Sequence, residues 1–155
     1  MDEVVKMEKP AAAARQAFWS MYEDRDPASA DDRKMAGATV RWRAVPDTRM
    51  VVSRFTQESG VGLFLRGTWG QKVATIAHRL RAADDQLSAD LGTGLGDPDH
   101  PYTTLLPVDW TDAEAVTAAI EWLVRRTDDY ADAVAKHLRA DGPGRSPDQQ
   151  SYVRI

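Results

Sequence analysis

The sequence predicts an α+β fold: a mainly antiparallel four-stranded sheet with an N-terminal helix and two long helices packed on one face. Three observations support this. Residues 39–44 alternate apolar and polar side chains with the two-residue period of a half-buried sheet, and two short apolar runs, 49–55 and 61–66, follow around a polar glycine turn. Residues 69–91 and 112–140 carry apolar side chains at three- and four-residue steps, as amphipathic helices do. A chain of 155 residues without cysteine suits one domain with its own hydrophobic core.

The first helix is predicted over residues 10–23. Pro10 suits a first helical turn, where its missing N–H costs no hydrogen bond, and Phe18 and Tyr22 follow on one helical face. The acidic, proline-containing residues 24–37 then indicate a solvated loop. One helical turn started by Ser29 fits within that loop.

The strands are predicted to form a meander. In the first run, 39–44, the apolar Val40, Trp42 and Ala44 alternate with polar residues. The second and third runs, 49–55 and 61–66, are separated by residues 56–60, whose glycine suits a hairpin turn. After the glycine-rich loop 92–101, residues 102–108 are predicted to form the fourth strand.

Two capping-box spacings mark the starts of the long helices. Thr68 and Gln71 predict a helix from about Trp69, and Thr111 and Glu114 predict the final helix, which should run to about residue 140. The apolar stripes of both helices must pack on the sheet, because exposing them to water is unfavourable.

The domain limits follow from composition. We expect a flexible N-terminus at residues 1–9, a single α+β domain at 10–140 and a mobile C-terminal tail at 141–155, which is rich in Gly, Pro, Ser and Gln. No apolar run approaches the ~20 residues needed to span a bilayer, and the N-terminus lacks the order of a secretory signal. With no cysteine to indicate an oxidising compartment, we expect a cytoplasmic protein without a membrane partner.

The order of elements resembles that of a known family. Phe18-Trp19 lies near the end of the first helix, the meander closes on the run from Gly60 to Gly67, and a long helix, a strand and a final helix follow. Over roughly residues 14–138 this arrangement is similar to an uncharacterised bacterial family, domain of unknown function 4268. Domains of that family sometimes lie beside nuclease-like modules, so the resemblance implies a link to nucleic-acid metabolism or defence.

Catalytic signatures are weak, and enzyme activity is disfavoured rather than excluded. The three histidines have no second ligand at metal-binding spacing, so no metal or cofactor is expected. The segment 92–96, Gly-Thr-Gly-Leu-Gly, follows a helix rather than a strand, which favours helix termination over a phosphate-binding loop. Asp97, Asp99 and His100 can in principle hold a divalent ion or serve a hydrolase, although an ordinary turn explains them better.

The best candidate site is the sheet face opposite the helices. We expect five apolar side chains to point inward: Val40, Trp42, Val61, Leu63 and Leu65. Alternation then places four other side chains on the outer face. These are Arg41, Arg43, Phe64 and Arg66. They can bind phosphates and stack bases, or the arginines can simply pair with nearby carboxylates and keep the face soluble. Phe55, Phe64 and Val51 can instead form an apolar interface with an arginine rim, if the register allows.

These alternatives set the functional predictions. The sequence favours a non-enzymatic protein-interaction module that binds an unknown protein partner or a second copy as a homodimer. The alternative is a nucleic-acid-binding accessory domain that uses the Arg and aromatic residues of the outer face. The net charge of −4 argues against a uniformly basic nucleic-acid-binding surface but not against a local one.

Overall fold

An antiparallel sheet of five strands, in the order β1-β2-β3-β4-β5, forms the centre of the fold. The computed structural model describes residues 2–35 and 39–139. The strands are β1 (Arg33–Met35), β2 (Val40–Val45), β3 (Met50–Gln57), β4 (Gly60–Gly67) and β5 (Thr104–Pro107). The predicted α+β class and antiparallel sheet are confirmed, with five strands in place of four.

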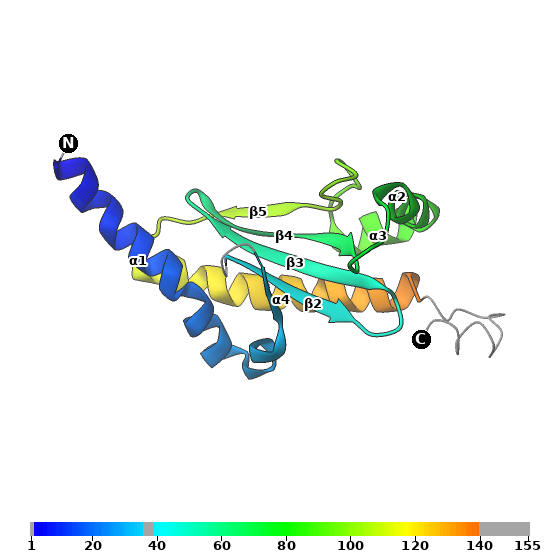
Figure 1. Ribbon diagram of the computed structural model, residues 1–155, viewed down its shortest axis with the longest axis horizontal. Coiled ribbons are helices and arrows are strands. Elements are labelled where there is room, and N and C mark those ends of the chain that lie inside the picture. Colours follow the sequence, from blue (N-terminus) through cyan, green and yellow to red (C-terminus); the bar gives the residue numbers. More distant parts are fainter. Residues whose placement is uncertain (1, 36–38, 140–155) are drawn as a thin grey trace.

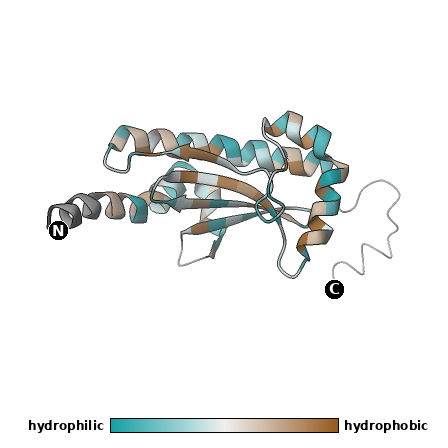
Figure 2. Ribbon diagram, turned by 90° about the horizontal axis from the view of Figure 1, so that it is seen from above, coloured by the Kyte–Doolittle hydropathy of each residue, from teal (hydrophilic) through white to brown (hydrophobic). Residues whose placement is uncertain are grey.

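The helices gather mainly on one side of this sheet. They are α1 (Asp2–Arg25), α2 (Val73–Ala82), α3 (Asp84–Leu91) and α4 (Ala113–His137), with a short 3-10 helix, η1, at Pro27–Asp31. Figure 1 shows α4 running behind β2, β3 and β4, and Figure 2 shows it from above as a separate layer along the sheet. The C-terminal half of α1 contacts α4, while α2 and α3 pack at one end of the sheet.

The hydrophobic core fills the space between α4 and the sheet. Val52, Leu63 and Leu65 point from the strands toward Leu123 and Val134 of α4, and all five are buried. The aromatic residues of α1 close one end of this core, where Phe18 lies 5.1 Å from Trp19 and 5.6 Å from Trp110 between ring centroids. These edge-to-face contacts add to the burial energy of large rings.

The β3–β4 hairpin turns where the sequence predicts it, with Gln57 paired to Gly60. A Cβ atom on Gly60 would lie 2.0 Å from the carbonyl oxygen of Leu106 in β5, so only glycine allows this close approach of the strands. The three predicted meander strands are therefore confirmed to within about two residues at each end.

Several predicted boundaries were wrong. α1 begins at Asp2, so residues 2–9, predicted as a flexible N-terminus, are helical. α2 begins at Val73 rather than Trp69, because Thr68 and Gln71 bond to each other in a turn before the helix, with 2.7 Å between Gln71 Nε2 and Thr68 Oγ1. The predicted tail at 141–155 lies outside the described residues.

The second and third helices were predicted as one. The helical conformation is interrupted at Ala83 (φ −111°), and α3 begins at Asp84. Tyr102 donates a hydrogen bond of 2.6 Å to the Asp84 carboxylate, which tethers this break to the start of β5. An acidic side chain is also favoured there, because helix N-termini carry partial positive charge.

The start of α4 differs by one residue from the predicted cap. Asp112, not Thr111, is the N-cap, and its carboxylate accepts from the backbone N–H of Glu114 at 3.0 Å. Thr111 instead donates its hydroxyl to Asp109 at 2.6 Å. None of the described helices is long and apolar enough to cross a membrane.

Candidate functional site

The two faces of the sheet carry different chemistry. Trp42 pairs with Ser53 and Ser53 with Phe64, so these three side chains share one face, together with the residues two positions away along each strand. We call this the open face; it carries Arg33, Met35, Val40, Trp42, Val51, Ser53, Phe55, Phe64 and Arg66. The helix face carries the alternate residues, Arg41, Arg43, Val45, Met50, Val52, Arg54, Thr56, Val61, Leu63 and Leu65.

The predicted site is therefore divided between the faces. Phe64 and Arg66 lie on the open face, as predicted, but Arg41 and Arg43 lie on the helix face. The prediction that Val40 and Trp42 point inward was wrong for the same reason. The helix face of β2 is polar, because three carboxylates and the Trp19 ring, from α1 and its flanking residues, lie opposite its arginines.

A buried ion-pair network explains why arginines occupy the helix face. Arg43 donates to Asp32 from Nε at 3.1 Å and from Nη2 at 3.2 Å, and also to Asp26 at 3.2 Å. Arg54 is fully buried and donates to the same Asp32 carboxylate. It also donates to the Tyr22 hydroxyl at 3.1 Å. Burial alone would lower the pKa of Arg43, but the Asp32 and Asp26 carboxylates raise it.

The Trp19 ring of α1 lies close to two arginines of the helix face, Arg41 and Arg54. The guanidinium carbon of Arg41 is 5.0 Å from its ring centroid and that of Arg54 is 5.8 Å away. Burial lowers the pKa of Arg41, while Glu23 and Asp32 act in the opposite direction. Arg41, Arg43 and Arg54 thus bind the sheet to α1 and η1, and their charges are used within the fold.

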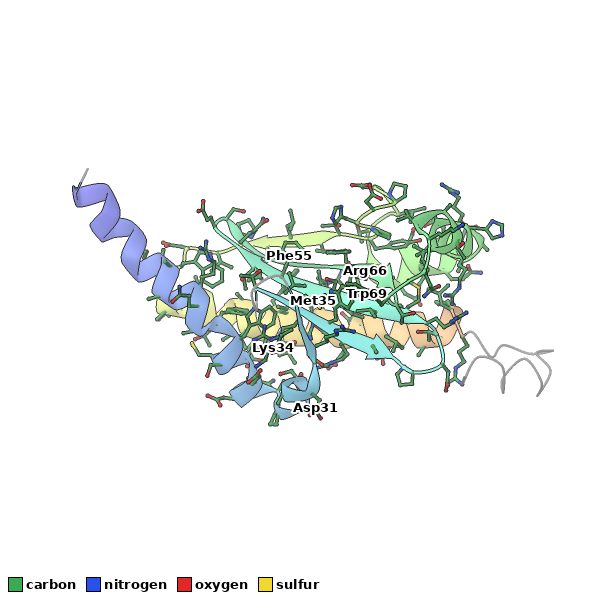
Figure 3. All side chains as sticks on the ribbon, viewed as in Figure 1. Asp31, Lys34, Met35, Phe55, Arg66 and Trp69 are labelled. Carbon is green, nitrogen blue, oxygen red and sulfur yellow. The ribbon has the colours of Figure 1, made fainter. Side chains whose placement is uncertain are left out.

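On the open face, arginines stack on tryptophans instead. The guanidinium carbon of Arg66 lies 3.9 Å from the Trp42 centroid, and that of Arg33 lies 5.5 Å from Trp69 and 6.0 Å from Trp42. The two indole centroids are 5.9 Å apart. Trp69, in the loop after β4, keeps 68% of its surface exposed. Figure 3 shows Met35, Phe55, Arg66 and Trp69 gathered over the sheet.

A second aromatic group lies beside these stacks. Phe55 and Phe64 are 6.0 Å apart between centroids, and His100 meets Phe64 edge-on at 5.0 Å. A Cβ on Gly62 would come within 2.6 Å of the Phe55 ring, so the glycine leaves the room that this ring occupies. Two strands and one loop therefore present adjacent ring surfaces.

The open face is hollowed between the two aromatic groups. A shallow groove of about 500 Å³ runs over β1 to β4, and a smaller recess of about 230 Å³ continues it toward α2. The two share Phe64, Arg66 and His100. The groove is lined by Met35, Val40, Trp42, Ser53, Phe55, Gln57, Phe64, Arg66 and His100. This volume falls in the range of small-ligand sites, but the groove is open rather than enclosed.

Within the described part of the chain, Arg33 and Arg66 of the open face have no acidic partner. Among the residues that the structure describes, no carboxylate lies within ion-pair distance of Arg33 or Arg66. The Nε of Arg66 donates to the carbonyl oxygen of Gly67 at 3.3 Å. Burial lowers the pKa of Arg66, with no acidic neighbour to oppose the effect. Both cations remain able to meet an anion.

The Asp97, Asp99 and His100 segment forms a hydrogen-bonded turn. The Asp97 carboxylate accepts from the backbone N–H of Asp99 at 2.9 Å and lies 3.3 Å from His100 Nδ1; these contacts lower the pKa of Asp97. Within residues 2–35 and 39–139, no three His, Asp or Glu side chains are grouped as metal ligands. The turn instead holds His100 against Phe64 at the end of the groove.

Sequence reasoning missed three contributors to the open face: Arg33, Met35 and Trp69. Arg33 and Met35 lie in β1, which occupies part of the predicted loop at 24–37. The alternation of Arg33 and Met35 with Lys34 is the only local signal, and three residues are too few to distinguish a strand from a loop. Trp69 was assigned to a helix that begins four residues later.

Comparisons of the chain with protein-family models, with curated proteins and with solved structures gave no match. The resemblance to the family described above stays a prediction. The functional argument therefore depends on the open face itself.

Proposed function

We propose that this chain is a binding module whose open face takes single-stranded nucleic acid. One observation carries the proposal: Arg33 stacks on the exposed Trp69 and Arg66 on the buried Trp42, without an acidic partner among the described residues, on the face that also presents Phe55 and Phe64. Sheet surfaces that bind single strands combine the same two features, aromatic rings for bases and cations for phosphates.

We propose separate roles for the aromatic rings and the arginines. Phe64 and Phe55 offer ring faces at the floor of the groove, where an unpaired base can stack. The guanidinium groups of Arg33 and Arg66 lie on the indoles; the Nε of Arg66 donates to Gly67, and we expect its terminal N–H groups and those of Arg33 to donate to phosphate oxygens. A duplex would not fit this scheme, because its bases are stacked on each other and show the protein only their edges.

The charge of the chain limits the affinity. With a net charge of −4, the molecule as a whole repels a polyanion, and only a few cations stand at the groove. We therefore expect modest affinity with a small but measurable salt dependence, and a large share of the binding energy from stacking, which is worth about 1–3 kcal/mol per base.

A protein contact is the second candidate function. The open face also carries Met35 and Val40, and Leu105 of β5 stands beside it with 54% of its surface exposed. Aromatic residues, Met and Arg are enriched in protein interfaces, while acidic residues and Lys are depleted there. A homodimer through this face would use the same side chains.

Fluorescence-anisotropy titration with labelled oligothymidylate tests the first candidate directly. The wild-type protein should bind single strands in preference to a duplex of the same length, more weakly as salt rises. Phe64→Ala should weaken binding about 5- to 150-fold, the equivalent of one lost stacked base. Glu121→Ala, on the opposite side of the molecule in a pair with Arg25, provides the matched control and should leave binding unchanged.

Absence of binding at low salt would contradict the nucleic-acid proposal. Sedimentation of the same samples then examines the second candidate. A concentration-dependent dimer that Trp69→Ala or Leu105→Asp disrupts would assign the open face to self-association, whereas a monomer at all concentrations would argue against the homodimer.

A further inference from the structure

We infer that Asp32 is a positioning residue, which holds β1 in the sheet and so places Arg33 on the open face. The inference rests on the proposed function for the role of Arg33 in binding, although the structural part can be tested without a ligand. Asp32 would thereby link the buried ion pairs of the helix face to the stacked cations of the open face.

β1 has little to hold it on its own. It is an edge strand of three residues, and β2 is its only partner within the described part of the chain. Two of its residues, Arg33 and Lys34, are exposed, so burial contributes little to keeping the strand in place. A strand this short and polar should detach readily unless its neighbours anchor it.

Asp32 supplies the anchor immediately before the strand. Its side chain is 6% exposed and accepts hydrogen bonds from two strands at once, from Arg43 of β2 and from the fully buried Arg54 of β3. The backbone N–H of Asp32 also donates to Ser29 of η1 at 3.0 Å. The residue that precedes β1 is therefore held by three hydrogen-bond partners, Arg43, Arg54 and Ser29.

Because side chains alternate along an extended chain, the anchored position of Asp32 also determines the side on which Arg33 lies. Asp32 has extended dihedral angles (φ −67°, ψ 142°), and in extended chain consecutive side chains point to opposite sides. With Asp32 directed into the helix face, Arg33 must point to the open face, where it pairs with Trp42 across the ladder and stacks over Trp69. The geometry thus makes the Arg33 position dependent on Asp32.

Hydrogen exchange measured by mass spectrometry tests the anchorage without any oligonucleotide. Asp32→Asn should increase exchange in peptides that cover β1, while peptides from α4 keep their protection. Because this variant leaves the Arg54 charge buried with neutral acceptors, the new amide oxygen and the Tyr22 hydroxyl, Asp32→Asn with Arg54→Met should be measured as well. That pair of changes removes both charges and is expected to fold. Asp26→Asn, which touches only Arg43, is the matched control and should affect β1 less.

A double-mutant cycle with Arg33→Ala tests the link to binding. If Asp32 acts through Arg33, then Arg33→Ala should weaken oligothymidylate binding in the wild-type background and have no further effect in the Asp32→Asn, Arg54→Met background. A purely structural role for Asp32 would leave the two effects additive.

The two proposals fail in distinguishable ways. If the wild-type protein binds no oligonucleotide, the proposed function is contradicted, and the exchange result alone decides the role of Asp32. Unchanged exchange of β1 in both Asp32 variants, or additive effects in the cycle, would overturn the positioning role even if the open face binds single strands.

Discussion

The two faces of the sheet use arginine in opposite ways. On the helix face, Arg43 and Arg54 are held by Asp32, so their charges are neutralised within the fold. On the open face, Arg33 and Arg66 stack on indole rings, and the described residues offer them no carboxylate. The residue type and the sheet are the same, so the partner of an arginine, rather than its presence, distinguishes a structural cation from a candidate binding cation.

The comparison predicts its largest effect for the helix face. Asp32→Ala removes the carboxylate shared by two arginines and leaves Arg54 buried without its acidic partner. Breaking a buried pair in this way lowers the free energy of unfolding by about 3–5 kcal/mol. Urea denaturation should show this loss. Glu121→Ala, which breaks the exposed pair with Arg25, should change stability little. A loss for Asp32→Ala no larger than for the control would contradict the assignment of the network.

Adjacent residues of β4 sharpen the comparison. Leu63 is fully buried on the helix face, so Leu63→Ala should lower the free energy of unfolding by about 2–5 kcal/mol and leave oligonucleotide affinity unchanged. Phe64 is half-buried on the open face, and Phe64→Ala should affect affinity more than stability. Thermal or urea unfolding, measured beside anisotropy titration, separates the two effects. Equal losses of stability with no change of affinity would show that the open face is only a packing surface.

Removing single cations of the open face should change the salt dependence of binding. Each phosphate contact contributes a slope of about 0.7 to the decline of log affinity with log salt for single strands. We expect Arg33→Ala and Arg66→Ala each to reduce the slope by about that amount. Arg25→Ala, on α1, removes the same charge far from the groove and should leave the slope unaltered. An equal reduction for all three variants would mean that only net charge matters.

The smallest expected effect concerns a carboxylate near the helix-face network. Burial, with Asp26 and Asp132 nearby, raises the pKa of Asp128, although Arg43 opposes the shift. Ionised Asp128 therefore disfavours the folded state above this pKa. Asp128→Asn should raise stability slightly at neutral pH, and the gain should disappear as the pH falls through the folded-state pKa. Urea denaturation of both proteins at several pH values measures this difference. A loss of stability in Asp128→Asn at neutral pH would contradict the prediction.

Periodicity predicted the regular elements well, but not their short neighbours. The three strands of the meander and the two long helical segments carry enough residues for a two-residue or a 3.6-residue period to be visible. β1 was missed because three residues show no period. The anchor that makes it a strand, the pairing of Asp32 with Arg43 and Arg54, joins segments far apart in the sequence.

The site was half predicted for a related reason. Alternation correctly separated Trp42 from Arg41 and Arg43, and it correctly placed Phe64 with Arg66. It could not determine which side of β2 is covered by helices, and the apolar Val40 and Trp42 suggested the wrong one. Partners for the arginines in α1 and before β1 reversed that choice. The sequence left it to the strand register whether Phe55, Phe64 and Val51 share one face. The register of β3 and β4 places all three on the open face.

Chemical-shift mapping by two-dimensional NMR tests the central claim most directly, because it locates the binding face residue by residue. Titration of the isotope-labelled protein with oligothymidylate should shift the indole N–H signal of Trp69 and backbone signals around Phe55, Phe64 and Arg66. Signals of α4 and of the Arg43 and Asp32 network should stay in place. Shifts confined to the helices, or none at all at low salt, would contradict the assignment of the open face as a nucleic-acid-binding surface.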